Sequence, residues 1–139
     1  MQNEERKELL GLYNGEEVRL RVDYYENVNI SISLDIKICN EYESYENLSV
    51  NIPGENLEKN LAYIRNDIPE IENFILKNRI GKPVKGKSYR MDEGDCELKL
   101  YELYEKKLMQ FDLKGYEKYL SEISLKNENL KQNNLKHRR

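Results

Sequence analysis

Eleven consecutive residues, from Val28 to Ile38, alternate strictly between apolar and polar side chains. Valine, isoleucine and leucine occupy the even positions, and asparagine, serine, aspartate and lysine occupy the odd positions between them. A period of two places all the apolar side chains on one face of an extended strand. The segment therefore predicts a long strand with one face in a hydrophobic core and the other in water, an arrangement typical of antiparallel sheets.

Other segments predict shorter strands around this one. Asn14-Gly15 is a dipeptide preferred in type I′ turns and lies between two apolar stretches, so it predicts a first hairpin. Leu48 to Ile52 repeats the alternation and is followed at once by Pro53-Gly54, which ends a ladder and opens a turn. Residues 61–64 and 95–104 predict two more extended segments.

Two segments carry the signals of helices. Asp67 is predicted to cap the first helix, in which apolar residues recur at helical spacing until Gly81 is expected to end it. Asp112 is predicted to cap the second helix. From Lys126 the sequence turns polar and basic, as a continuation of that helix or as a tail.

The length of 139 residues suffices for one hydrophobic core but not for two of independent stability. We therefore predict one α+β domain over residues 1–125, with a mostly antiparallel β-sheet and helices packed on one face. Residues 126–139 are predicted to form a basic polar tail or helix extension. No apolar run reaches the roughly 20 residues of a membrane span, and the first residues are charged, so we expect a cytoplasmic protein with no membrane partner.

Charged residues are segregated by sign along the chain, although the net charge is only -3. Such blocks usually form loops or a solvated face, but a patch of one sign also steers a partner of opposite charge. The acidic candidates for partner binding are Glu41, Glu43, Glu46, Glu55, Glu58, Asp92, Glu93 and Asp95. The basic candidates, for nucleic-acid binding, are Lys77, Arg79, Lys82, Lys85, Lys87 and Arg90. Gly81, Pro83 and Gly86 place the middle of this basic block in a predicted loop.

Tyrosine is the dominant aromatic residue, with 11 Tyr against 2 Phe and no Trp, so aromatic contacts to a partner would be made by tyrosine. The aromatic candidates for partner binding are Tyr42, Tyr45 and Tyr89, which fall in or near predicted turns. A tyrosine ring gives a large contact area with a polar tip, which suits both sheet packing and recognition. The sequence leaves both roles open for each of the three.

No set of residues specifies a reaction. The single histidine, His137, lies three residues from the C-terminus, where no third group would orient it as a catalytic base. Two cysteines and one histidine are too few for a structural zinc site, and the glycines match no phosphate-binding loop. We expect no catalytic residue, no metal and no cofactor. An enzyme that uses scattered carboxylates is a further class of function that the sequence leaves open, beside protein binding and nucleic-acid binding.

One set of motifs is similar to a known family. The segment Val50-Asn51-Ile52-Pro53, followed by Phe74, Asn78, Gly81 and Gly86, resembles the domain-of-unknown-function family 4313, and the resemblance covers roughly residues 10–104. It implies an accessory protein of conjugative plasmids, integrative elements or phages of low-GC bacteria. Genes of that kind often lie beside inhibitors of host defence or act as such inhibitors.

We therefore expect a non-enzymatic protein-binding module from a mobile genetic element or phage. Its sharpest form is an anti-CRISPR inhibitor whose acidic surface, residues 41–58, occupies the nucleic-acid channel of a CRISPR effector or another host nuclease. The alternative is a nucleic-acid-binding accessory or regulatory protein that acts through the basic residues 77–90 and the C-terminal segment. The sequence does not specify an oligomeric state.

Overall fold

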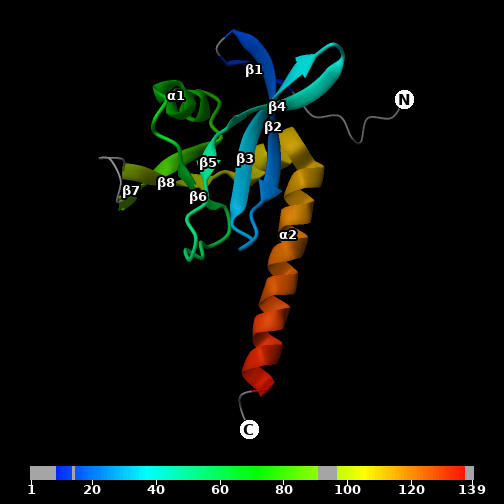
Figure 1. Ribbon diagram of the computed structural model, residues 1–139, viewed down its shortest axis with the longest axis vertical. Helices are drawn as coiled ribbons and strands as arrows, with labels where there is room; N and C mark the ends of the chain where they lie inside the picture. The colour runs from blue at the N-terminus through cyan, green and yellow to red at the C-terminus, as the bar shows by residue number, and fades with distance from the viewer. Residues whose placement is uncertain (1–8, 14, 91–96, 137–139) are drawn as a thin grey trace.

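Two four-stranded antiparallel sheets and two helices make up the fold (Figure 1). The computed structural model describes residues 9–13, 15–90 and 97–136. The first sheet has the order β1 (Leu9–Tyr13), β2 (Glu16–Tyr24), β3 (Ile30–Ile38), β4 (Glu41–Asn47). The second has the order β5 (Ser49–Val50), β6 (Leu61–Ile64), β8 (Glu97–Leu103), β7 (Gly81–Arg90). The helices are α1 (Pro69–Lys77) and α2 (Glu105–Lys136). The predicted α+β class, antiparallel pairing and C-terminal helix are confirmed.

The alternating segment forms β3 and supplies the centre of the core. Ile30, Ile32 and Leu34 are buried, as the period of two predicts, but the other face is not wholly in water, because Ser33 and Asp35 are buried as well, at 5% and 6% exposure. The strand begins two residues later than predicted because Val28 has a φ of +68°, which places it in the turn from β2. The strand also extends past the core at its other end, where Ile38 is 45% exposed. The other buried core residues include Val18, Leu20, Val22, Ile64, Ile71, Ile75, Ile80, Tyr101, Leu103, Leu108, Tyr116 and Tyr119.

Leu48 is the point at which the chain passes from the first sheet to the second. Its amide donates to the carbonyl of Ile32 at 3.0 Å, and its own carbonyl accepts from the amide of Arg65 at 3.0 Å. One fully buried residue thus bonds to β3 on one side and to the end of β6 on the other. The division of the strands into two sheets depends on this crossing, for which the sequence contains no local signal.

The second sheet carries apolar side chains on both faces. Tyr101 and Leu103 face the main core, whereas Tyr63, Leu98 and Leu100 form a smaller buried cluster with Ile52 on the other face. Both helices contribute to the main core, as expected, but the segment after β5 covers part of this second face. Antiparallel sheets with two apolar faces require cover on both sides.

Two signals around α1 predict the wrong boundary. Asp67 does not cap the helix, because its carboxylate accepts hydrogen bonds from the Arg65 guanidinium, at 2.8 Å from Nη2. The N-cap residue is Ile68, without a side-chain cap bond. Gly81 does not end the helix, which stops four residues earlier, at Lys77, with Asn78 as its C-cap. Gly81 begins β7 instead, where a Cβ would lie 2.6 Å from the carbonyl oxygen of Glu102.

The predicted basic loop is in fact the strand β7, at the edge of the second sheet. Its pairing with β8 is interrupted by a bulge between Pro83 and Ser88. Gly86 lies within the bulge with a φ of +77°, a conformation in which glycine is favoured. The glycines and proline therefore mark a bulged edge strand, which has the same residue preferences as a loop.

The predicted cap at Asp112 is confirmed, and the carboxylate has a second role. Asp112 has φ -155° and ψ 74°, which separates an initial segment of α2 from the long part that follows. Its Oδ1 accepts from the amide of Gly115 at 3.2 Å, as an N-cap does, and its Oδ2 accepts from the amide of Val22 at 2.8 Å. Pairing of β1 to β2 ends at Arg19, so no β1 residue pairs with Val22. A Cβ at Gly115 would overlap both the Val22 carbonyl and this carboxylate.

We expect Asp112→Ala to lower the free energy of unfolding by about 2–4 kcal/mol, because it removes a helix cap and leaves a buried amide without an acceptor. Asp112→Asn retains one good acceptor and should lose less. Urea denaturation followed by circular dichroism measures both effects. The matched control is Asp23→Ala, which removes an exposed carboxylate that accepts a hydrogen bond from the adjacent Tyr24 amide and should cost about 0.5 kcal/mol or less.

Candidate functional site

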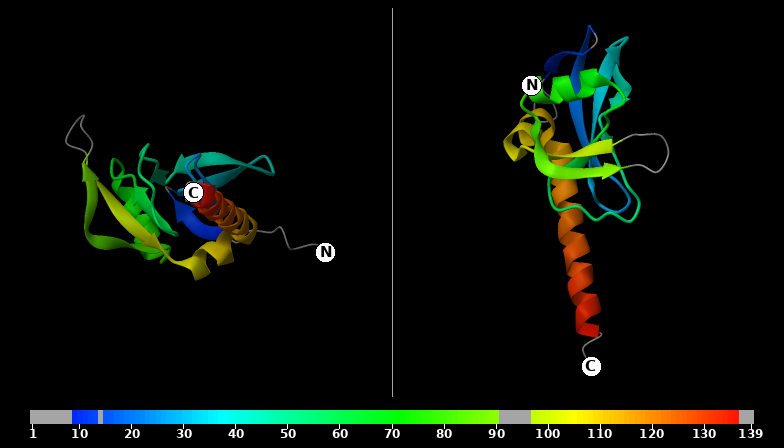
Figure 2. Two further views of the ribbon diagram at one scale, coloured as in Figure 1. Left: turned by 90° about the horizontal axis from the view of Figure 1, so that it is seen from below. Right: turned by 90° about the vertical axis from the view of Figure 1, so that its left-hand side faces the viewer.

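The hairpin of β3 and β4 extends away from the rest of the first sheet (Figures 1 and 2). Its turn residues Cys39 and Asn40 have φ values of 51° and 68°, the pair of positive values that a type I′ turn requires. The acidic residues Glu41, Glu43 and Glu46 therefore lie on the strand β4. Tyr42 and Tyr45 also belong to β4 rather than to turns. Because β4 is at the edge of the sheet, its outer backbone groups have no strand partner among the described residues.

One side of this hairpin continues the core face of the sheet into solvent. Ile38 lies opposite Glu41 and Ile36 lies opposite Glu43, so the two acids share a face with the isoleucines. Ile38 is 45% exposed and Tyr45 is 37% exposed. We call the four exposed residues of this side the hairpin face: Ile38, Glu41, Glu43 and Tyr45. It combines apolar and acidic groups on a single exposed surface.

The opposite side of the hairpin is held by two arginines of β2. The guanidinium carbon of Arg19 lies 3.3 Å from the centre of the Tyr42 ring. Arg21 donates from Nη2 to the Ser44 hydroxyl at 2.7 Å, and its Nε lies 3.2 Å from the Asp35 carboxylate. Tyr42 is therefore engaged by Arg19, and these contacts fix the hairpin to β2.

Glu46 is not part of the hairpin face. It accepts from the hydroxyl of Tyr13 at 3.3 Å and from Nη1 of Arg65 at 3.3 Å. Arg65 also donates to the carbonyl of Asn47 and to Asp67, so it connects the end of β4 to the start of α1. Its hydrogen bonds lower the pKa of Asp67 below the usual range. Burial, together with the nearby Glu46 charge, raises the pKa of Tyr13 to about 12.

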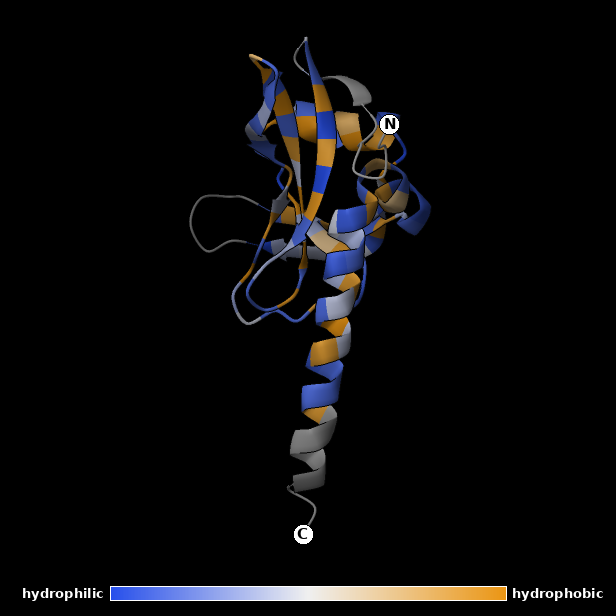
Figure 3. Ribbon diagram, turned by 90° about the vertical axis from the view of Figure 1, so that its right-hand side faces the viewer, coloured by the Kyte–Doolittle hydropathy of each residue, from blue (hydrophilic) through white to orange (hydrophobic). Residues whose placement is uncertain are grey.

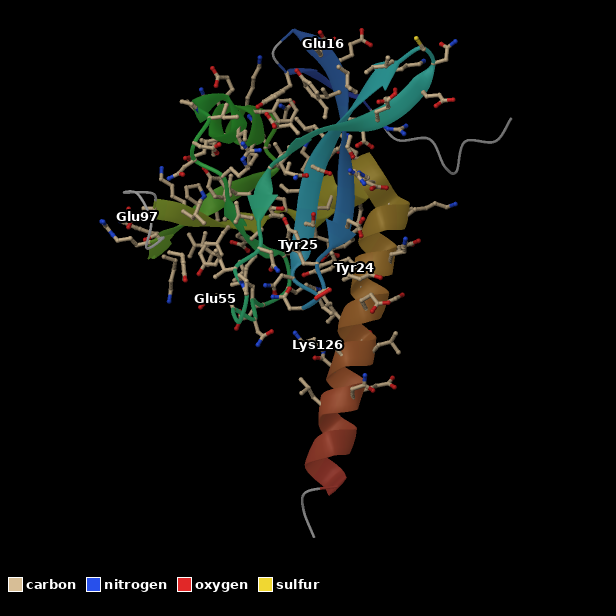
Figure 4. All side chains as sticks on the ribbon, in the orientation of Figure 1. Glu16, Tyr24, Tyr25, Glu55, Glu97 and Lys126 are labelled. Atoms are coloured by element: carbon tan, nitrogen blue, oxygen red, sulfur yellow. The ribbon has the colours of Figure 1, made fainter. Side chains whose placement is uncertain are left out.

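The remaining acidic candidates lie elsewhere. Glu55 accepts from the hydroxyl of Tyr63 at 3.3 Å, on the segment that covers the second sheet, and Figure 4 places it far from the hairpin. Glu58 is exposed beside α2. The structure therefore does not join residues 41–58 into one acidic surface. Asp92, Glu93 and Asp95 lie outside the described residues.

The basic candidates are spread along two elements. Lys77 is the last residue of α1, Arg79 lies in the turn that follows it, and the other four lie on β7. All six are exposed, and none forms an ion pair with another described residue. Lys82 and Arg90 pair in register with Glu102 and Glu97, which offset their charges. Lys85 and Lys87 lie in the bulge, at positions with no partner on β8.

Tyr89 packs more closely than a turn residue would. Its ring lies edge-on to that of Tyr63, with centroids 5.9 Å apart, and it borders the smaller apolar cluster. Tyr63 itself is buried. Only part of the Tyr89 ring is therefore available to a partner, next to the basic edge of β7.

Ile38, Arg19 and Arg21 are the residues of this region that sequence reasoning missed. The alternation predicts Ile38 to be in the core. Its exposure follows only from the tertiary structure, in which the core ends before this residue. The two arginines could have been inferred from their alternation with Val18, Leu20 and Val22. Across the described residues, no group of three or more His, Cys, Asp or Glu is arranged to hold a metal ion. The described helices include none with the length and apolar character needed to cross a bilayer.

A family model described as a domain of unknown function (DUF4313) matches residues 20–123. The chain belongs to this family. The DUF4313 match runs from β2 into α2 and so includes the β3–β4 hairpin, both faces of the second sheet and the junction at Asp112. Neither the curated proteins nor the solved structures contain a match to this DUF4313 chain.

The raised pKa of Tyr13 predicts a loss of stability in alkali. The contribution is fully present below pH 10, the usual tyrosine pKa, and is lost as the pH rises through about 12. We expect the Tyr13→Phe variant, which has no phenol to ionise here, to lose less stability than the wild type between pH 9 and pH 11, by on the order of 1–2 kcal/mol. Urea midpoints across this range measure the difference. An exposed-ring variant, Tyr104→Phe, is the control, and equal slopes for the wild type and Tyr13→Phe would contradict the assignment.

Proposed function

We propose that this DUF4313 chain is a non-enzymatic protein-binding module that contacts its partner through the hairpin face. The observation that carries the proposal is the exposure of Ile38 and Tyr45 beside Glu41 and Glu43 on a free edge strand. Interfaces commonly combine apolar or aromatic anchors with charges that select the partner. The contacts of Arg19 and Arg21 fix the hairpin before binding, which reduces the entropy lost on association.

The chemistry of the face favours a basic partner. Two carboxylates on alternate residues attract lysine and arginine and repel a second acidic strand. The unpaired outer edge of β4 can also accept an extended segment by strand addition, in which main-chain hydrogen bonds add to side-chain contacts.

In its sharpest form the partner is a CRISPR effector or another host nuclease, and the face occupies its nucleic-acid channel. Alternate residues of a strand are about 6.8 Å apart along its axis, which equals two phosphate steps of about 3.4 Å each along one DNA strand. Glu41 and Glu43 could therefore stand in for two phosphates. The resemblance to the family, which implies a gene carried on a mobile element, supports this form by association only.

A second candidate is nucleic-acid binding through β7. The favouring observation is the pair Lys85 and Lys87, which lie exposed in the bulge without ion pairs to described residues, near the half-buried Tyr89. Two lysines make a small electrostatic site, and the acidic body of the protein opposes further phosphate contacts.

The first experiment tests the hairpin face by reversing its charge. We expect the wild-type protein to capture a basic protein from a lysate of the bacterial host, and Glu41→Lys/Glu43→Lys to bind the purified partner at least tenfold more weakly, mainly through slower association. The control Glu102→Lys/Glu117→Lys makes the same change in net charge at exposed sites on β8 and α2 and should bind normally. Equal binding by both variants, or capture of no protein, would contradict the proposal.

A salt titration separates the second candidate from the first. If the chain binds single- or double-stranded nucleic acid through β7, Lys85→Glu/Lys87→Glu should weaken a gel shift and reduce the dependence of log affinity on log salt by about 1.4–1.8. The hairpin variant should then bind nucleic acid as the wild type does. If no shift is seen at low salt, this second candidate is excluded.

A further inference from the structure

The outer edge of β4 exposes main-chain groups in a pattern that the hairpin fixes. In an antiparallel ladder, alternate residues turn both their N–H and C=O groups toward the neighbouring strand. The two-residue turn makes Ile38 and Glu41 the first bonded pair of the hairpin, and Glu43 turns to β3 in the same way two residues later. The main-chain groups of Tyr42 and Ser44 therefore point away from β3, toward the open edge of the sheet.

The other end of β4 limits this open edge. The Leu48 amide donates to the Ile32 carbonyl on β3, and the Asn47 carbonyl, which faces outward, accepts from Arg65 at 3.0 Å. The register skips Tyr45, which is the extra residue of a bulge. Each outward-facing residue between the turn and the bulge offers one main-chain donor and one acceptor, without a strand partner in the described part of the chain. This short stretch is thus ready to pair with an added strand.

Charge, rather than shape, protects this stretch of the edge. Edge strands are commonly protected from unwanted pairing by charges, prolines or bulges. Between the turn and the bulge, β4 has no proline, and its charged residues are Glu41 and Glu43. A second copy of β4 added antiparallel would bring the same acids together on one face, which is unfavourable. A basic segment meets no such repulsion, so the edge selects its partner by charge.

The two sides of the edge differ in charge. On the hairpin face, Glu41 and Glu43 are exposed and form no ion pair with described residues. On the other side, the Arg19 guanidinium stacks on Tyr42, and the exposed Lys37 lies opposite Tyr42 in register. Successive side chains of a strand alternate between the two sides, as Figure 3 shows for the bands of hydropathy along the first sheet. An added strand therefore gains most when basic residues occupy every second position, on the hairpin face.

We propose that the partner binds as an extended segment that adds a strand to β4 and carries lysine or arginine at every second position. Its main chain pairs with Tyr42 and Ser44, and its basic side chains lie against Glu41 and Glu43. The methylene groups of those side chains cover the exposed Ile38, since long basic residues bury their stems on apolar surface. The inference rests on the proposed function and specifies the partner segment and its mode of binding.

The register of pairing gives this mode its specificity. Because side chains alternate with a period of two, a shift by one residue moves the basic side chains from the hairpin face to the side of Arg19 and Lys37. Like charges then meet, so the shifted register is disfavoured. We therefore expect a basic segment without the alternation to bind more weakly than an alternating one of the same composition.

Calorimetric titration with synthetic peptides tests the inference without a captured partner. The parent peptide, of about ten residues, alternates lysine with threonine and has blocked ends. It should bind the wild-type protein, and a peptide of the same composition with its lysines in one block should bind about tenfold more weakly. N-methylation of alternate residues removes the donors from one edge of the peptide only. One of the two methylated peptides should therefore bind as the parent does, and the other at least tenfold more weakly.

Three results of this titration would overturn strand addition. The first is no binding of the parent peptide at millimolar concentration. The second is equal binding by the two methylated peptides, because a strand added to an edge uses the donors of one side only. The third is equal binding by the parent and the block peptide, because the two sides of the edge would then not select the pattern.

A change in the edge itself gives a second test. Ser44→Pro removes one outward N–H and leaves the acids in place, because proline is tolerated on an edge strand where its nitrogen faces away from the ladder. It should bind the parent peptide at least tenfold more weakly. The control Ser44→Ala keeps the N–H and loses only the hydroxyl that accepts from Arg21, so it should bind as the wild type does. Equal binding by the two variants would contradict the proposal.

Amide hydrogen exchange of the wild type gives a readout that requires no variant. The amides of Tyr42 and Ser44 should exchange at least tenfold more slowly when the parent peptide is saturating, because they gain acceptors from the added strand. Unchanged exchange at both amides in the saturated complex would overturn the proposal, since the peptide would then bind elsewhere.

Failure of this inference is distinguishable from failure of the proposed function. If Ser44→Pro captures the partner normally while Glu41→Lys/Glu43→Lys does not, the hairpin face binds its partner without strand addition. The inference is then overturned and the proposed function stands. If both variants capture the partner normally, both are overturned.

Discussion

The buried carboxylate of Asp112 connects the long helix to the first sheet, and the arrangement of both depends on it. It caps the helical segment that follows and accepts the Val22 amide, at a position where β1 no longer pairs with β2. The absence of a side chain at Gly115 lets the helix backbone approach the strand. Together these contacts direct α2 along β2, and that direction carries its second half away from the core.

A second constraint, at Leu48, determines where the chain leaves the first sheet. Its hydrogen bonds to Ile32 and Arg65 turn the chain into the second sheet after the end of β4, whereas β3 and β4 extend past the core at the opposite end of their ladder. The hairpin face exists because these two strands are longer than the core, since Ile38 lies on a core face that has no core beneath it. The hairpin face is therefore a core-type face that continues beyond the core.

Much of the fold could be predicted from local patterns. The alternation of β3 and the cap at Asp112 were read correctly because each signal acts over a few residues. Asp67 and Gly81 were misread because other residues decide their roles: a guanidinium takes the carboxylate of Asp67, and β8 requires a glycine at position 81. A bulged edge strand and a loop have similar compositions, so β7 could not be distinguished from a loop by sequence.

The candidate site could be predicted only in part. The sequence by itself determined the elements with a strong local pattern, such as β3 and the long part of α2, as well as the positions of the acidic and basic blocks and the family, because periodicity, capping residues and motifs are properties of neighbouring residues. Only the tertiary structure decided which charges stay available. Glu46 and Glu55 are bonded to Arg65 and Tyr63, whereas Glu41 and Glu43 remain exposed beside Ile38. The physical reason is that a carboxylate's availability depends on the donors that folding brings to it, and those donors come from strands that the sequence does not place.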